Sequence, residues 1–142
     1  MKIYVDTSFL ISLYSLDINS AAAARTMQAS RGDHLVSTLG ELEAANALQL
    51  RVFRKEVSAA QAHSSAAAFE KDLRDGVFQL QPLTDQAFEK ARQLSRQNTA
   101  RLGTQTADLL HVAAALDPRA DYLYTFDQQQ RKLAQTVGMK VN

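Results

Sequence analysis

The sequence contains no cysteine, and this absence excludes disulfide bonds, thiolate metal sites and cysteine nucleophiles. It also lacks any apolar run near the roughly 20 residues that cross a bilayer. Its opening stretch, MKIYVDTS, is too short in apolar residues and too soon acidic for a signal peptide. We therefore expect no signal peptide and no membrane partner, and a cytoplasmic location fits the lack of cysteine.

The chain also has no excess of charge of one sign, because 16 lysines and arginines stand against 15 acidic residues, for a net charge of +1. The chain therefore lacks the strong positive charge that would indicate nucleic acid binding. A partner that carries phosphates would need a local basic patch. No repeat or linker divides the chain. With 142 residues, of which 46% are hydrophobic, we expect one domain over residues 1–142 with a substantial core.

What the chain does contain is an alternation of apolar segments with the periods of strands and helices. The pattern predicts strands over residues 2–5, 34–37, 77–80, 122–125 and 139–141. It predicts helices over residues 7–16, 18–30, 39–54, 58–76, 84–101 and 127–136, and another that opens at 104 or 106 and runs to 116. Strands this short, separated by helices, require parallel crossovers. The predicted fold class is α/β, with a short parallel sheet of four to five strands flanked by helices.

The stretch KIYVDTSFLISL places a carboxylate, Asp6, at the end of a strand that is otherwise apolar. Burying a charge there is costly unless the charge is paired. One explanation is helix capping, since an Asp side chain accepts hydrogen bonds from the first backbone N–H groups of a helix. The other is that Asp6 faces a cation at the carboxyl end of the sheet, where ligands bind in such folds. Asp127, two residues past the predicted strand 122–125, allows the same two explanations.

Further carboxylates are expected at the same edge of the sheet. Glu41 and Glu43 lie near the start of the predicted helix 39–54, and Asp108 lies near the start of the apolar helix TADLLHVAAAL. Stabilisation by the helix dipole would explain one such acid, but several in one cleft would repel each other without a cation. No lysine or arginine lies beside them in sequence. All-oxygen ligation suits Mg²⁺ or Mn²⁺, so the pattern indicates a metal-dependent nuclease.

Four segments in order give the chain a resemblance to the PIN-domain ribonucleases: VDTSFL, ELEAANAL, DLLHVAAAL, and YLYTFDQQQRKLA followed by GMKV. The chain is most similar to the toxin components of VapBC-type toxin–antitoxin systems, and the match covers nearly its whole length. The resemblance implies an endoribonuclease that uses Mg²⁺ or Mn²⁺ and leaves a 5′-phosphate and a 3′-hydroxyl. It also implies an RNA substrate, a cognate antitoxin protein and a homodimer.

The resemblance assigns an acidic quartet as catalytic residues and metal ligands: Asp6, Glu43, Asp108 and Asp127. Neighbouring polar side chains would position ligands or water; they are Thr7, Ser8, Asn46 and Thr125. Helical phase does not separate Glu43 from Glu41. Glu43 is preferred because the family's glutamate precedes an Asn-Ala-Leu-like segment, from which two residues separate it.

One departure from the family concerns the loop before the third acid. Many relatives carry an arginine where this chain has Gln105, so a phosphate contact from that loop would require Arg101 to reach across. His111 follows Asp108 by three residues and is expected to be a packed helix histidine rather than a ligand.

Some segments fit two interpretations. Arg51, Arg54 and Lys55 fit either a grip on the RNA backbone or an exposed helix end. The apolar segments 9–16 and 48–53 fit either a dimer or antitoxin surface or buried core.

Three other functions compete with the nuclease. A haloacid-dehalogenase-like phosphatase needs a second acid two residues after the first, where this chain has Ser8. A phosphoacceptor receiver domain needs a lysine near the end of a late strand, where this chain has Thr125. The more serious alternative is a catalytically silent PIN-like module that binds RNA or a protein, against which the four intact acids weigh.

Overall fold

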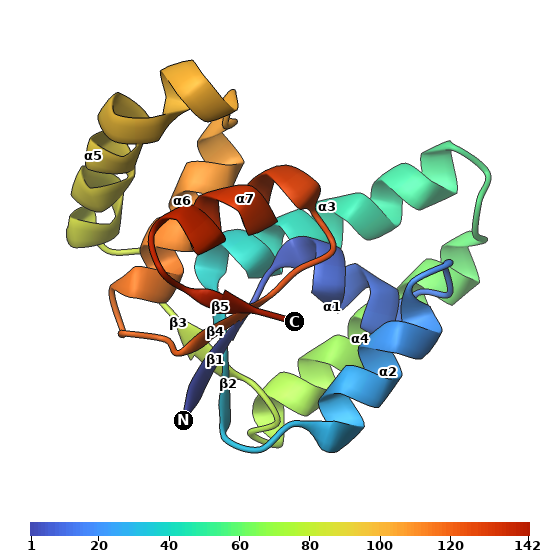
Figure 1. Ribbon diagram of the computed structural model, residues 1–142. Coiled ribbons are helices and arrows are strands. Elements are labelled where there is room, and N and C mark those ends of the chain that lie inside the picture. The colour runs from blue at the N-terminus through green and yellow to red at the C-terminus, as the bar shows by residue number, and fades with distance from the viewer.

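Five short parallel strands form a single sheet through the middle of the molecule (Figure 1). They are β1 (Lys2–Val5), β2 (Asp33–Ser37), β3 (Gln79–Gln81), β4 (Tyr122–Tyr124) and β5 (Lys140–Val141). The strands lie in the order β3-β2-β1-β4-β5, and every neighbouring pair is parallel. This computed structural model describes residues 1–142 and confirms the predicted α/β class and parallel sheet.

Seven helices cover the two faces of the sheet. On one face lie α1 (Thr7–Tyr14), α2 (Ser20–Ala29), α3 (Thr38–Phe53) and α4 (Ala59–Arg74). On the other lie α5 (Asp85–Leu102), α6 (Thr106–Leu116) and α7 (Gln128–Thr136). Figure 1 shows α2 and α4 on one side of the strands and α5 and α6 on the opposite side. None of these helices is both long and apolar enough to cross a membrane.

Alternating side chains of the strands divide the core into two parts. Tyr4 and Leu35 are buried with residues of α5, α6 and α7, whereas Ile3 and Val5 are buried with residues of α1 to α4. This alternation is the geometry of an extended strand. Because β1 is central and covered on both faces, its residues from Ile3 to Val5 are all apolar or aromatic.

The boundary between the first two helices differs from the prediction. Residues 15–19 form a turn, so α1 stops at Tyr14 and α2 begins at Ser20. The Asp17 carboxylate accepts hydrogen bonds from Asn19 N at 2.8 Å and from Ser12 Oγ at 2.9 Å. An Asp side chain that captures nearby donors in this way favours a turn over a continuing helix.

The third strand also differs, since β3 begins two residues later than predicted. Gly76 ends α4 in the left-handed conformation, with φ 79°. Val77 N then donates a hydrogen bond to the carbonyl oxygen of Asp72 at 2.9 Å. This bond closes the helix end, and therefore Val77 does not join the sheet.

The apolar segment 9–16 is mostly core, whereas in segment 48–53 only Leu48 is buried. Their buried members are Phe9, Leu10, Ile11, Ser12, Ser15 and Leu48. The structure nevertheless leaves Leu16 and Phe53 exposed at the ends of these segments.

The order of the strands reverses beside β1. The chain moves outward from β1 to β2 and β3, and later places β4 and β5 on the opposite side of β1. In open parallel sheets a crevice forms at such a reversal, outside the carboxyl ends of the strands, and ligands bind there. Asp6 lies at this point, because its N donates to the carbonyl oxygen of Tyr124, the last residue of β4, at 3.1 Å.

Candidate functional site

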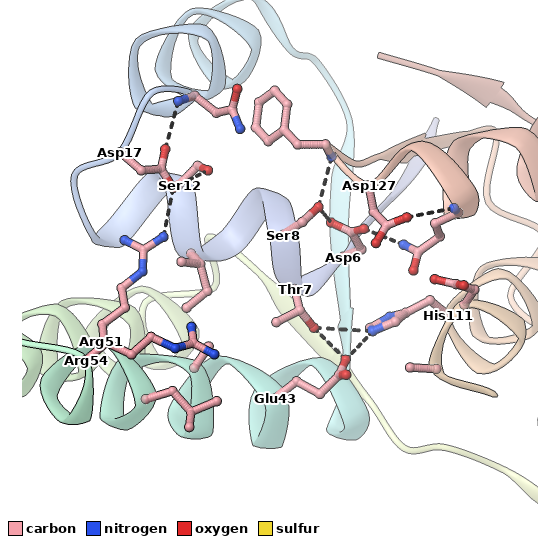
Figure 2. Close-up of a pocket in the computed structure, with 18 residues that line it drawn as sticks. Asp6, Thr7, Ser8, Ser12, Asp17, Glu43, Arg51, Arg54, His111 and Asp127 are labelled. Carbon is pink, nitrogen blue, oxygen red and sulfur yellow. Dashed lines mark hydrogen bonds and ion pairs between the residues drawn. The ribbon is translucent and has the colours of Figure 1, made fainter. Parts of the chain in front are cut away.

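A cleft with a volume of about 520 Å³ opens where the strand order reverses (Figure 2). Only 5 of its 18 lining residues are hydrophobic, so the cleft suits a polar ligand. It is lined by all four carboxylates that the sequence singled out: Asp6, Glu43, Asp108 and Asp127. They come from the end of β1, from α3, from α6 and from the residue before α7. The fold therefore brings together acids that are far apart in the sequence.

Asp6 caps α1, as the first explanation expected, and its carboxylate also lines the cleft. Its Oδ1 accepts hydrogen bonds from Phe9 N at 2.9 Å, which caps α1, and from Ser8 Oγ at 2.7 Å. Its Oδ2 accepts hydrogen bonds from Thr125 Oγ1 and Gln130 Nε2. The residue is only 1% exposed, and burial raises the pKa of its carboxyl although these donors act against the rise.

Glu43 is held from two sides by one of its oxygens. Thr7 Oγ1 donates to Glu43 Oε1 at 2.7 Å, and His111 Nε2 contacts the same oxygen. The side chain remains 32% exposed to the cleft. The hydrogen bond from His111 is the main reason that the pKa of Glu43 is lowered.

His111 is buried and linked to β1. Its Nδ1 lies 2.8 Å from the Tyr4 hydroxyl, which in turn lies 2.7 Å from Ser37 Oγ. The His111 and Tyr4 rings pack edge to face, with centroids 5.8 Å apart. His111 is packed within its helix as predicted, but it also contacts a carboxylate of the cleft.

Asp108 and Asp127 lie at the N-terminal ends of α6 and α7. Asp108 Oδ2 accepts a hydrogen bond from Gln105 N at 2.9 Å, and Asp127 Oδ1 accepts one from Gln130 N at 3.0 Å. Burial raises the pKa of Asp108 against the effect of the Gln105 hydrogen bond, and the charges of Asp127 and Glu43 raise it further. Asp127 and Glu43 are therefore close enough to disfavour the charged form of Asp108.

Three of the predicted companions hydrogen-bond to acids of the cleft; they are Thr7, Ser8 and Thr125. Asn46 does not join them, since it is exposed and does not line the cleft. Ala47, four residues after Glu43, takes the position that faces the cleft. Glu41 lines a separate groove between α3 and α4, so only Glu43 of the two candidate glutamates reaches the cleft.

The sequence analysis missed the contacts of two buried polar residues, His111 and Gln130. Each lies three residues after a predicted acid on the same helix face, His111 after Asp108 and Gln130 after Asp127. Gln130 is only 3% exposed and donates to Asp6. A polar residue one turn beyond an acid was therefore a usable signal.

The basic residues of the cleft lie apart from the acids, near the end of α3 (Figure 2). Arg51 forms an ion pair with Asp17, with Nη2 and Oδ2 2.9 Å apart. Arg54 is exposed and takes no part in an ion pair. Arg101 does not reach the cleft, because it donates to Asn98 Oδ1 on its own helix at 3.0 Å.

The donor set of the cleft suits a hard divalent cation. Four carboxylates supply oxygen ligands, and the buried carboxylate of Asp6 has no lysine or arginine to pair with. As the side chains stand, no three acidic or histidine residues are arranged to hold a single ion. Each acid instead accepts hydrogen bonds from the protein, so ligation would exchange some of these partners for the cation.

Comparison with known families decides which fold this is. The family model of the PIN domain matches residues 3–135, which is nearly the whole chain. The chain belongs to the PIN domain family. No curated protein matches its sequence.

Solved structures resemble this PIN domain over nearly their full length. The sarcin-ricin loop cleaving toxin VapC20 of Mycobacterium tuberculosis matches with a TM-score of 0.74 and 20% identity, over 96% of this chain and 95% of that chain. VapBC2 from Rickettsia felis, bound to a promoter DNA fragment, matches with a TM-score of 0.68 and 14% identity, over 100% of this chain and 98% of that chain. FitAcB from Neisseria gonorrhoeae matches with a TM-score of 0.67 and 16% identity, over 98% of this chain and 95% of that chain. At these identities the likeness establishes a shared fold.

Proposed function

We propose that this PIN domain is an endoribonuclease that depends on Mg²⁺ or Mn²⁺ and acts as the toxin of a type II toxin–antitoxin system. The observation that carries the proposal is the meeting of four carboxylates, from separate elements, in one polar cleft with no lysine or arginine beside them. Membership of the PIN family and the VapC-like fold support the same function.

The four carboxylates Asp6, Glu43, Asp108 and Asp127 would hold the cation. When bound, a divalent cation polarises a phosphoryl oxygen and activates water for attack on a phosphodiester. The protein's own contribution is to keep the ligand oxygens in place: Asp6 is fixed by four hydrogen bonds and Glu43 by two contacts on one oxygen. No side chain is needed as a covalent nucleophile.

Arg54 is the basic side chain placed to contact the RNA backbone. It lines the cleft beyond the acids, is exposed and has no acidic partner. Arg51 is less available because it is paired with Asp17. Contacts of this kind with phosphates position a nucleic acid without reading its bases.

The function is tested with end-labelled RNA, incubated with the purified protein in Mg²⁺, Mn²⁺ or EDTA. We expect metal-dependent cuts with 5′-phosphate ends. Asp6→Asn and Asp108→Asn should lower the cleavage rate by more than about 100-fold, since even replacing residues around a metal's ligands costs up to this much. Glu43→Gln and Glu41→Gln form a matched pair on α3, of which only Glu43→Gln should lose activity.

The alternative function is a silent PIN-like module that binds RNA or a protein. Folded wild-type protein that binds RNA but cuts none with either metal would favour this alternative. Equal activity of Glu43→Gln and the wild type would instead show that the acids were assigned wrongly.

The partners follow from the same proposal. The VapBC-type likeness supports a cognate antitoxin that covers the cleft and a toxin that pairs as a homodimer. Large apolar side chains remain exposed beside the cleft, at Leu16, Ile18 and Phe53, where a protein partner would bury them.

A further inference from the structure

We propose that His111 is a positioning residue that fixes the carboxylate of Glu43 toward the bound cation. The inference rests on the proposed function, because it treats Glu43 as a metal ligand. Its basis is a chain of hydrogen bonds that runs from the buried sheet to the cleft through Ser37, Tyr4, His111 and Glu43. Figure 2 shows the cleft end of this chain, where Thr7, Glu43 and His111 meet.

The inner end of this series of hydrogen bonds is anchored in the core. Ser37 Oγ accepts a hydrogen bond from Gly40 N at 3.1 Å, which caps α3, the helix that carries Glu43. Tyr4 is fully buried in the central strand, and its hydroxyl lies between Ser37 Oγ and His111 Nδ1. The imidazole is therefore anchored at one nitrogen by the core while its other nitrogen contacts Glu43.

The donor and acceptor in each of these hydrogen bonds can be assigned, because every bond needs one donor and one acceptor. Because the Glu43 carboxylate only accepts, His111 Nε2 must carry a proton. In the neutral ring Nδ1 then accepts from the Tyr4 hydroxyl, which itself accepts from Ser37 Oγ. Burial raises the pKa of Tyr4, so this hydroxyl keeps the proton that it donates.

The two contacts on Glu43 both fall on one of its carboxylate oxygens and leave the other without a protein donor. Thr7 Oγ1 and His111 Nε2 both approach Oε1, and no protein donor approaches Oε2. Oε2 is thereby left for a ligand in the cleft. His111 would thus determine which oxygen Glu43 presents, without itself touching the cation.

Two substitutions separate positioning from packing. The amide nitrogen of His111→Gln reaches the position of Nε2 and can donate to Glu43, whereas the amide of His111→Asn reaches only the position of Nδ1, near Tyr4. Both remove the ring that packs against Tyr4. A merely structural role would therefore affect both variants alike.

The measurement is Mn²⁺ affinity, which is determined from the electron paramagnetic resonance signal of free Mn²⁺. We expect His111→Asn to bind about 10- to 100-fold more weakly than wild type and His111→Gln to stay within about threefold, as for residues that orient a ligand. Equal loss in both variants, or no loss in His111→Asn, would overturn the inference. Wild-type protein that binds no Mn²⁺ would overturn the metal site, and this inference with it.

A second measurement uses the metal-free protein. Nitrogen-15 NMR of the His111 ring should show a proton on Nε2. A ring with its only proton on Nδ1 would overturn the inference even if the enzyme cleaves RNA with metal, so the two failures are distinguishable.

Discussion

Asp6 serves two purposes with different energetic demands. As a helix cap it accepts a hydrogen bond from Phe9 N at 2.9 Å, which a neutral side chain could also do. As a charge it is buried with no lysine or arginine beside it. Burial raises its pKa, so folding without a cation disfavours the charged form relative to the unfolded chain. The charged residue is therefore unfavourable for stability until a cation binds.

We expect Asp6→Asn to raise the free energy of unfolding in EDTA at neutral pH by about 1 kcal/mol, because a buried charge is removed. The Asn oxygen can still accept from Phe9 N, and the side chains of Thr125 and Gln130 can turn to accept its N–H groups. Urea unfolding over a series of pH values measures this gain. A variant that is less stable than wild type in EDTA would contradict the expectation.

The pH dependence of that gain has a definite sign. Because the pKa of Asp6 is raised, the folded wild type holds more protons than the unfolded chain above the ordinary value of 3.8. Wild-type stability therefore falls as the pH rises through this window, and the advantage of Asp6→Asn appears there and is absent below it. Mn²⁺ should stabilise the wild type and not Asp6→Asn.

Residues could be recognised from the sequence where local order alone brings them to the cleft. Asp6 follows a strand and Asp108 opens a helix, and both positions lie at the carboxyl edge of any parallel sheet. The link between His111 and Glu43 could not be read in this way, because 68 positions separate them. It depends on how α6 lies against α3, which no local pattern records.

At the scale of elements, every predicted strand and helix is present and only boundaries moved. The boundaries moved where one residue competes with the regular backbone, as Asp17 does between α1 and α2 and Gly76 does before β3. Period and propensity describe the interior of an element well. The hydrogen bond that ends an element depends on a single side chain or glycine, which is why ends are harder to predict.

The turn between α1 and α2 is fastened to α3 by Asp17 and Arg51. The Arg51 guanidinium donates to Asp17 Oδ2 at 2.9 Å and to Ser15 Oγ at 2.8 Å. Burial acts to raise the pKa of Asp17, but hydrogen bonds from Arg51, Asn19 and Ser12 outweigh it and hold the pKa below its ordinary value. The charged form of Asp17 therefore stabilises the fold.

We expect Asp17→Asn to lower the free energy of unfolding by about 1.5–3 kcal/mol at neutral pH, the range for hydrogen bonds to charged groups. The contribution of Asp17 is present above pH 3.8 and is lost as the pH falls through its lowered folded pKa. Urea unfolding at neutral and acid pH measures the difference, which should vanish in acid.

Asp75→Asn is the matched control for this ion pair. Asp75 pairs with Lys71 on the open surface, with the two side chains 51% and 67% exposed, so its loss should cost less than about 0.5 kcal/mol. Equal costs for the two variants, or a cost of Asp17→Asn that persists in acid, would contradict the role of the turn.

At the scale of the whole molecule, the site exists only when both layers are assembled. Glu43 comes from the layer of α1 to α4, and Asp108 comes from the layer of α5 to α7. Asp6 lies between them at the end of the central strand. A ligand shared by these acids would therefore hold the two layers together, and its binding would stabilise the fold as a unit.

The same assembly leaves three large apolar side chains exposed, Leu16 and Ile18 in the turn after α1 and Phe53 at the end of α3; they are 90%, 98% and 82% exposed. Arg51 ties the turn that carries Leu16 and Ile18 to the end of α3, near Phe53. Exposed apolar side chains of this size favour a protein interface. In the proposed homodimer, a second copy of this chain would bury them.

We expect the wild type to sediment as a dimer and the double variant Ile18→Asp, Phe53→Asp as a monomer, because a charge in an apolar interface costs several kcal/mol. Both side chains are exposed in the single chain, so the variant should keep its circular dichroism spectrum. Phe88→Asp, on α5 in the other layer, is the control and should remain a dimer. A double variant that still dimerises would place the interface elsewhere, and a monomeric wild type would leave these exposed side chains to an antitoxin.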